Sequence, residues 1–240
     1  MSKLILPRVF KDTSKDGKYK HLIGKPKLSY SQITSWKDAK YHYDYIKQYF
    51  VGITMDSGIF AQAGTDFGTM VEWIGNGRVG KKPQAIILTQ SNVEEVAEKV
   101  EYKPNSIYED LIVVDCGDFV IEGYADRCTY YEDTKEIEIL DYKTGNMSKP
   151  DKYKSNDYMQ TRLYAYQKEN DGYNVKSCGV ELFDRKGNGS EKYPIRLTGE
   201  LMKIDTPYNR DEVEEWLKND ISKIASEISD CYKTYLKIFK

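Results

Sequence analysis

The sequence has no hydrophobic run of the roughly 18 to 20 residues that a membrane-spanning helix needs. Its first residues, MSKLILPRVFKD, contain only a short apolar stretch before Pro7, whereas a secretory signal needs about 7 to 15 such residues. These absences argue against membrane insertion and against secretion. We expect the protein to stay in the cytoplasm of the cell in which it is made.

The motifs of several other protein classes are missing too. The four cysteines are scattered and form no Cys-x-x-Cys pair, which argues against a zinc ribbon and against a disulfide framework. No Gly-x-x-x-x-Gly-Lys-[Ser/Thr] segment is present, so the sequence carries no P-loop helicase motor. Any chemistry must therefore come from other side chains.

Charge is nearly balanced overall but unevenly distributed. The net charge is -2, yet residues 1–50 carry eleven Lys and Arg against four Asp, and residues 91–138 carry fourteen Asp and Glu against four Lys and Arg. Both segments could be ordinary solvated faces. The alternative is that a basic surface holds a polyanion while acidic residues hold cations.

The hydrophobic pattern predicts an α/β fold, with a mixed sheet and helices packed over it. The predicted helices span residues 28–46, 64–75, 91–102, 156–170 and 211–235, and the predicted strands span 110–116, 119–131, 136–143, 175–185 and 191–197. A chain of 240 residues suits one domain. We expect a helical part at 28–105, a catalytic α/β core at 106–200 and a C-terminal helix at 209–237.

The segment EIEILDYKTGN, residues 136–146, ends a predicted strand with Asp141 and Lys143. The Asp-x-Lys pattern recurs elsewhere, for example at Asp133, so it is weak by itself. Here an apolar strand precedes it, and residues two apart on a strand point to the same face. Asp126 comes at the end of the segment FVIEGYAD in the adjacent predicted strand, and the short turn EDTK would bring it near Asp141. Two carboxylates and an ammonium group would then converge, although a surface ion pair is the simpler alternative.

Such a group suits phosphodiester hydrolysis, in which charge grows on the phosphate and a water must become nucleophilic near neutral pH. Asp126, Asp141 and the Tyr142 carbonyl offer the hard oxygen ligands that Mg²⁺ or Mn²⁺ prefers. Lys143 would orient or activate the water, or stabilise the developing charge. Glu72, on an earlier predicted helix, could complete the metal site or could be an ordinary solvated residue.

Polar and basic side chains follow this strand. Gln160 and Tyr164 lie one helical turn apart, and this Gln-x-x-x-Tyr spacing occurs only once in the sequence. Their shared face could present both to a nucleic-acid strand, or Tyr164 could simply pack in the core. Lys149, Lys152 and Lys154 lie just after the strand and could contact phosphates.

The segments GYADR, ILDYKTG and QTRLY together resemble, in order and spacing, the RecB-type nucleases of the PD-(D/E)XK superfamily. The resemblance spans about residues 28–183. It implies a restriction-endonuclease-like core with Asp126 and Asp141 as metal ligands and Lys143 as the catalytic lysine. The other residues that it implicates, as DNA contacts or as organisers of the site, are Gln160, Tyr164, Arg127 and Thr144.

The chain departs from the family pattern at two points. Many members carry a His on the early helix, where this chain offers Glu72. Many also hold an iron-sulfur cluster through one early and three late cysteines. Cys231 stands alone near the C-terminus, so we expect no cluster here.

The resemblance implies a Mg²⁺- or Mn²⁺-dependent deoxyribonuclease, and it favours an exonuclease in DNA recombination, repair or replication, of the kind that phages encode. The substrate would be single-stranded DNA or a duplex with an end, and a recombination or replication protein could be a partner. Three alternatives stay open: a restriction or junction-resolving endonuclease, a DNA-binding protein that has lost cutting, and a chance match in an unrelated domain.

Overall fold

The computed structural model describes residues 4–39, 42–56, 58–87 and 90–239. Contacts within the chain divide it into two compact units. The first takes residues 1–56, 111–124 and 209–240, and the second takes residues 57–110 and 125–208. Neither unit is a continuous stretch of sequence.

Among the described residues, seven strands pair in a mixed sheet. From one edge the order is β1 (Arg8–Val9), β2 (Pro26–Ser29), β4 (Val120–Tyr131), β5, β6 and β7, and β3 (Ser106–Asp115) also pairs with β4. β4 pairs antiparallel with β5 (Glu136–Gly145), and β6 (Asn174–Lys186) pairs antiparallel with β7 (Arg196–Asp205). β5 and β6 are parallel. A parallel pair needs a long crossover, and this one carries two helices.

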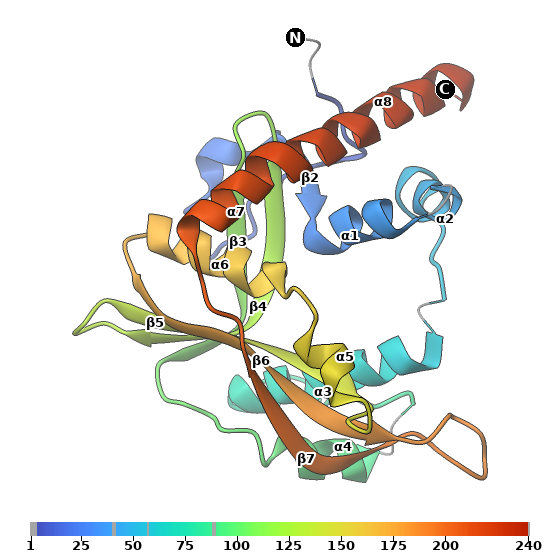
Figure 1. The fold of residues 1–240 in the computed structure, drawn as a ribbon, viewed down its shortest axis with the longest axis vertical. Coiled ribbons are helices and arrows are strands. Elements are labelled where there is room, and N and C mark those ends of the chain that lie inside the picture. The colour runs from blue at the N-terminus through green and yellow to red at the C-terminus, as the bar shows by residue number, and fades with distance from the viewer. Residues whose placement is uncertain (1–3, 40–41, 57, 88–89, 240) are drawn as a thin grey trace. The chain divides into compact units, whose positions relative to one another are not determined.

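The helices of the second unit are α3 (Gly58–Gly75), α4 (Gln90–Ala97), α5 (Pro150–Lys154) and α6 (Met159–Asn170). α3 and α4 lie on one face of the sheet and α6 on the other (Figure 1). Phe67 of α3 packs on Phe183 of β6 in the core of the first face. Val180 and Leu182 pack on the other face, because neighbouring strand residues alternate between faces. The predicted mixed sheet with helices over it is confirmed.

The first unit combines N-terminal elements with the C-terminal helices. Its elements are β1 (Arg8–Val9), η1 (Lys20–Leu22), β2 (Pro26–Ser29), α1 (Tyr30–Asp38), α2 (Tyr43–Tyr45), the π-helical η2 (Ile46–Val51), α7 (Arg210–Trp216), the π-helical η3 (Leu217–Ile221) and α8 (Ser222–Phe239). A reciprocal side-chain and backbone pairing of Ser29 with Gln32 caps α1. Over the described ranges, no helix has the length and apolar character needed to cross a bilayer.

Several predicted boundaries were wrong. The helix predicted at 28–46 ends at Asp38, because Ala39 adopts an extended conformation; residues 40–41 lie outside the described residues. The strand predicted at 191–197 forms instead at Arg196–Asp205, since the preceding segment is a loop in which the Asn188 N–H bonds the Tyr193 carbonyl. The short helix α5 was not predicted at all.

Candidate active site

The hairpin of β4 and β5 brings two carboxylates together. Arg127 pairs with Leu140 in the antiparallel register, so the next positions outward are Asp126 and Asp141. The backbone N–H of Tyr142 donates to the Asp126 carboxylate at 2.6 Å. Asp141 is only 4% exposed. The predicted convergence of these two aspartates is therefore present, and the tight hairpin is its cause.

Lys143 lies beside them on the same strand. Its ammonium group is 2.7 Å from the Asp141 carboxylate. Burial by itself would lower the pKa of Lys143, but the charges of Asp141 and then Asp126 outweigh it and raise that pKa. Lys143 consequently stays charged at neutral pH, which suits a hydrogen-bond donor to a phosphate better than a general base.

The electrostatics of Asp126 favour a bound cation. Burial, followed by repulsion from Asp141, raises the pKa of the Asp126 carboxyl well above its usual range, although Lys143 and the Tyr142 N–H act in the opposite direction. A divalent cation held by these carboxylates would offset this repulsion. The carboxylates and the nearby Tyr142 carbonyl are all hard oxygen donors, so they fit Mg²⁺ or Mn²⁺.

These donors do not form a complete cage. Within the described ranges, no group of three or more His, Cys, Asp or Glu side chains is arranged to hold a metal ion. Mg²⁺ is commonly held by one or two carboxylates together with waters and substrate phosphates. An incomplete set of protein ligands is thus the arrangement expected for a site that must also accept a substrate.

A cavity of about 450 Å³ opens beside these residues. Asp126, Tyr142, Lys143 and Thr144 from the two strands line one part of it, and Glu109 lines another. The remaining wall is one side of α3, formed by Phe60, Ala61, Gly64, Thr65, Gly68 and Thr69. A side chain added at Gly68 would meet nothing within 4 Å, so this part of the α3 wall borders open space.

Glu109 is a site residue that sequence reasoning missed. It sits on β3 with a φ of 54°, in the left-handed region that is uncommon for residues other than glycine. Burial, then the charge of Glu72 and then that of Asp141, raises the pKa of Glu109. Glu72 on α3 therefore lies near Glu109, although it does not line the cavity. No sequence pattern marks Glu109, because its side-chain direction depends on a backbone conformation that strand alternation does not predict.

For the deoxyribonuclease activity that the sequence resemblance implies, Glu109→Gly is expected to lower the cleavage rate about 100-fold, as for loss of a group that handles a proton or a water, without lowering Tm. The unfolding temperature should hold because glycine adopts a positive φ without strain. Lys135→Gly is the matched control, since Lys135 has a φ of 52° and lies in the β4–β5 turn. Unchanged cleavage by Glu109→Gly would show that Glu109 does not take part.

The helix that follows the crossover holds the Gln-x-x-x-Tyr pair. The Gln160 side-chain amide donates to the Tyr164 hydroxyl at 2.8 Å. Tyr164 is only 2% exposed. Burial is the main reason why the pKa of Tyr164 is raised, and the charges of Asp141 and Asp126 add to it, so the hydroxyl lies near both carboxylates. This geometry suits a role in organising the site.

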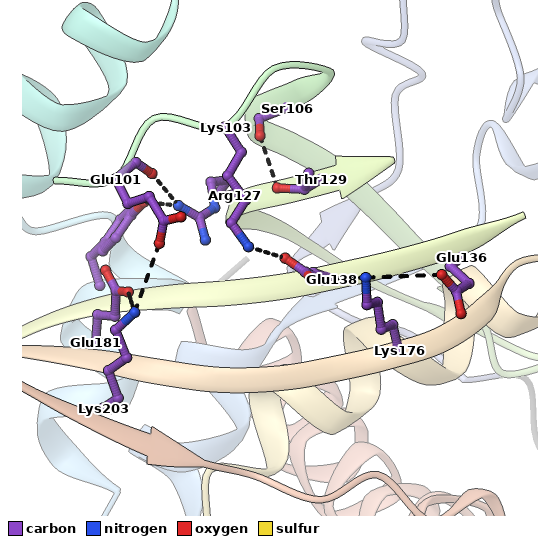
Figure 2. A network of polar contacts seen from close by, with 11 residues as sticks. Glu101, Lys103, Ser106, Arg127, Thr129, Glu136, Glu138, Lys176, Glu181 and Lys203 are labelled. Carbon is purple, nitrogen blue, oxygen red and sulfur yellow. Dashed lines mark hydrogen bonds and ion pairs between the residues drawn. The ribbon is translucent and has the colours of Figure 1, made fainter. Parts of the chain in front are cut away.

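Arg127 lies at 4% exposure on the face that α3 and α4 cover. Its guanidinium donates to the Glu101 carbonyl at 2.6 Å and to the Tyr142 hydroxyl at 3.3 Å. Figure 2 shows it among the ion pairs of the same face, which include that of Lys103 with Glu138. Arg127 can brace the strand that carries Asp141, but its burial leaves it no access to DNA.

The lysines after β5 differ from the cavity residues in position. Lys149 precedes α5, and Lys152 and Lys154 lie on it; all three are exposed. None of them lines the cavity that holds Asp126. A contact with phosphates would therefore fall outside the cavity.

A protein-family model matches a large part of this chain. Residues 81–232 match the family model described as the PD-(D/E)XK nuclease superfamily, and this is more than half of the chain. The matched region contains Glu109, Asp126, Asp141, Lys143 and Tyr164, whereas Glu72 precedes it. A search of curated proteins gave no match. The mixed sheet and its flanking helices are the restriction-endonuclease-like fold, and the chain belongs to the PD-(D/E)XK nuclease superfamily.

Proposed function

We propose that the protein is a divalent-metal-dependent DNA nuclease that hydrolyses phosphodiester bonds. The observation that carries this proposal is the convergence of Asp126, Asp141 and Lys143, of which Asp126 and Lys143 line the cavity. Membership of the nuclease superfamily supports it. The two units would act as parts of one nuclease domain.

The proposed roles follow from the chemistry of each group. Asp126, Asp141 and the Tyr142 carbonyl would hold Mg²⁺ or Mn²⁺, with Glu72 as a further candidate ligand. When bound, the cation would polarise the scissile phosphate and lower the pKa of a bound water. Lys143, which stays charged, would donate to the phosphate oxygens and stabilise the charge that develops on them.

We further propose that the enzyme is an exonuclease of the RecB type, acting in DNA recombination, repair or replication. The Gln160–Tyr164 hydrogen bond beside the two carboxylates supports this assignment, because the resemblance to that branch rests partly on this pair. The alternative among metal-dependent DNA nucleases is an endonuclease. The alternative that is not an enzyme is a DNA-binding protein without cutting activity, and the presence of Asp126, Asp141 and Lys143 argues against it.

The test compares linear and covalently closed circular DNA, each single- and double-stranded, in Mg²⁺, in Mn²⁺ and in EDTA. An exonuclease is expected to shorten the linear forms from their ends and to leave the circles intact, in either metal but not in EDTA. Cutting of circles would favour the endonuclease. Binding of DNA without cutting in any metal would favour the non-catalytic alternative.

Exposed lysines near α5 are proposed to hold DNA phosphates. Each phosphate contact contributes about 0.7 to 0.9 to the slope of log affinity against log salt concentration. Changing Lys149, Lys152 and Lys154 together to Ala is therefore expected to reduce that slope by about 2, measured by fluorescence anisotropy of a labelled strand. A control with the same charge change replaces three exposed lysines of the C-terminal helices, Lys218, Lys223 and Lys237. Equal effects of both triple variants would show that the α5 region has no special role.

A further inference from the structure

An aromatic ring and a guanidinium group lie together at the wall of the cavity. Phe60, in the first turn of α3, is 48% exposed although it is a large apolar side chain. The Arg185 guanidinium carbon lies 4.2 Å from the centre of its ring. An Arg185 N–H also donates to the Phe60 carbonyl at 2.9 Å. The side chain and backbone of Phe60 are thus both held by the same residue.

The loop between β6 and β7 helps to fix this arrangement. Arg185 lies near the end of β6, where the loop begins. Gly189 in the loop lies so close to Ile59 that an added side chain would meet the Ile59 methyl group, so the loop packs on the first turn of α3. Arg185 covers one face of the Phe60 ring, yet nearly half of Phe60 is exposed. Part of the aromatic surface of Phe60 therefore faces outward.

We propose that Phe60, backed by Arg185, stacks on an unpaired base of the DNA strand whose phosphate lies at Asp126 and Lys143. The inference rests on the proposed nuclease function and adds the state of the substrate. Phe60 lines the same cavity as those two residues, so one strand can reach both. Aromatic rings bind single-stranded nucleic acid in this way, and a neighbouring Arg adds a cation–π contribution.

The size and lining of the cavity favour one unpaired nucleotide over a duplex. A volume of about 450 Å³ lies within the range of pockets for small molecules, roughly 300 to 1,000 Å³. On α3 the cavity is lined by Gly64, Thr65, Gly68 and Thr69. Because the two glycines have no side chains, they leave room for a sugar and a phosphate. Among the described residues that line the cavity, none is an Asn, Gln or Arg, the side chains that commonly read base edges. Binding is therefore expected to be tolerant of sequence.

The experiment uses short single strands in which 2-aminopurine replaces one base in turn, with phosphorothioate linkages and Ca²⁺ to prevent cleavage. Quenching of the fluorescence is expected at one or two adjacent positions in the wild-type protein. Phe60→Ala is expected to abolish that quenching and to weaken binding of the single strand about 5- to 150-fold. Phe60→Trp is expected to keep both, because it preserves an aromatic surface.

The matched control is Tyr131→Ala. Like Phe60, Tyr131 has a cationic side chain over its ring, since the Lys176 ammonium lies 4.2 Å from the ring centre, but Tyr131 does not line the cavity. It is expected to bind and quench like the wild type. If the wild type cuts DNA but Phe60→Ala keeps full quenching and affinity, the stacking inference is wrong while the nuclease function stands. The inference would also be wrong if Phe60→Ala lost as much affinity for a duplex with cross-linked ends as for a single strand, since such a duplex has no unpaired base. A wild-type protein that neither binds nor cuts DNA would overturn the proposed function itself.

Discussion

Asp141→Asn is expected to lower the rate of DNA cleavage at least about 10³-fold in Mg²⁺ or Mn²⁺, while the protein stays folded. The variant keeps the size of the side chain but loses a charge that the proposed metal site needs and that pairs with Lys143 at 2.7 Å. Loss of such charge stabilisation amounts to several kcal/mol in the transition state, and about 1.4 kcal/mol corresponds to a factor of ten. Single-turnover cleavage of an end-labelled strand measures the effect.

Asp133→Asn provides the control for that measurement. Asp133 and Lys135 repeat the Asp-x-Lys pattern of Asp141 and Lys143, but they lie in the exposed β4–β5 turn. Cleavage by Asp133→Asn should match that of the wild type. Activity retained by Asp141→Asn would place the chemistry elsewhere in the chain, and equal losses in both variants would point to a general effect of charge.

Asp126→Asn is expected to make the metal-free protein more stable at pH 8 while abolishing cleavage. Burial and Asp141 raise the pKa of Asp126 above that of the unfolded chain, which is near 4. Between these two pKa values the folded protein binds more protons than the unfolded chain does. The free energy of unfolding therefore falls as pH rises through this range. An amide does not titrate, so the variant avoids this loss and its Oδ1 can still accept from the Tyr142 N–H.

The difference is measured by urea unfolding in EDTA at pH 5 and at pH 8. We expect the variant to gain on the order of 1 to 2 kcal/mol over the wild type between these two pH values, since one unit of pKa corresponds to about 1.4 kcal/mol. Added Mg²⁺ should reverse the order, because the cation stabilises only a folded protein that binds it. A stability difference that is independent of pH and unaffected by Mg²⁺ would contradict both the raised pKa and the metal site.

The centre of the candidate site could be predicted from local patterns in the sequence. The alternation of residues 136–140 predicts a strand, and the two-residue period of a strand then places Asp141 and Lys143 on one face. The short turn after Tyr131 restricts the register of the hairpin, so the approach of Asp126 to Asp141 could be predicted as well. Gln160 and Tyr164 were paired by the helical repeat alone, and their hydrogen bond agrees with it. All of these relations are local in the chain.

The other features of the site depend on how distant segments of the chain pack together. Arg127 was a candidate either as a DNA contact or as an organiser of the site, and its burial on the face of the sheet that α3 and α4 cover favours the second role. Glu109 lines the cavity and has a positive φ, which no pattern in the sequence predicts. Phe60 and Arg185 are 125 positions apart, and only the packing of the β6–β7 loop on α3 brings them together. Periodicity fixes which neighbours along a strand or helix share a face, whereas contacts between distant segments depend on how whole elements pack.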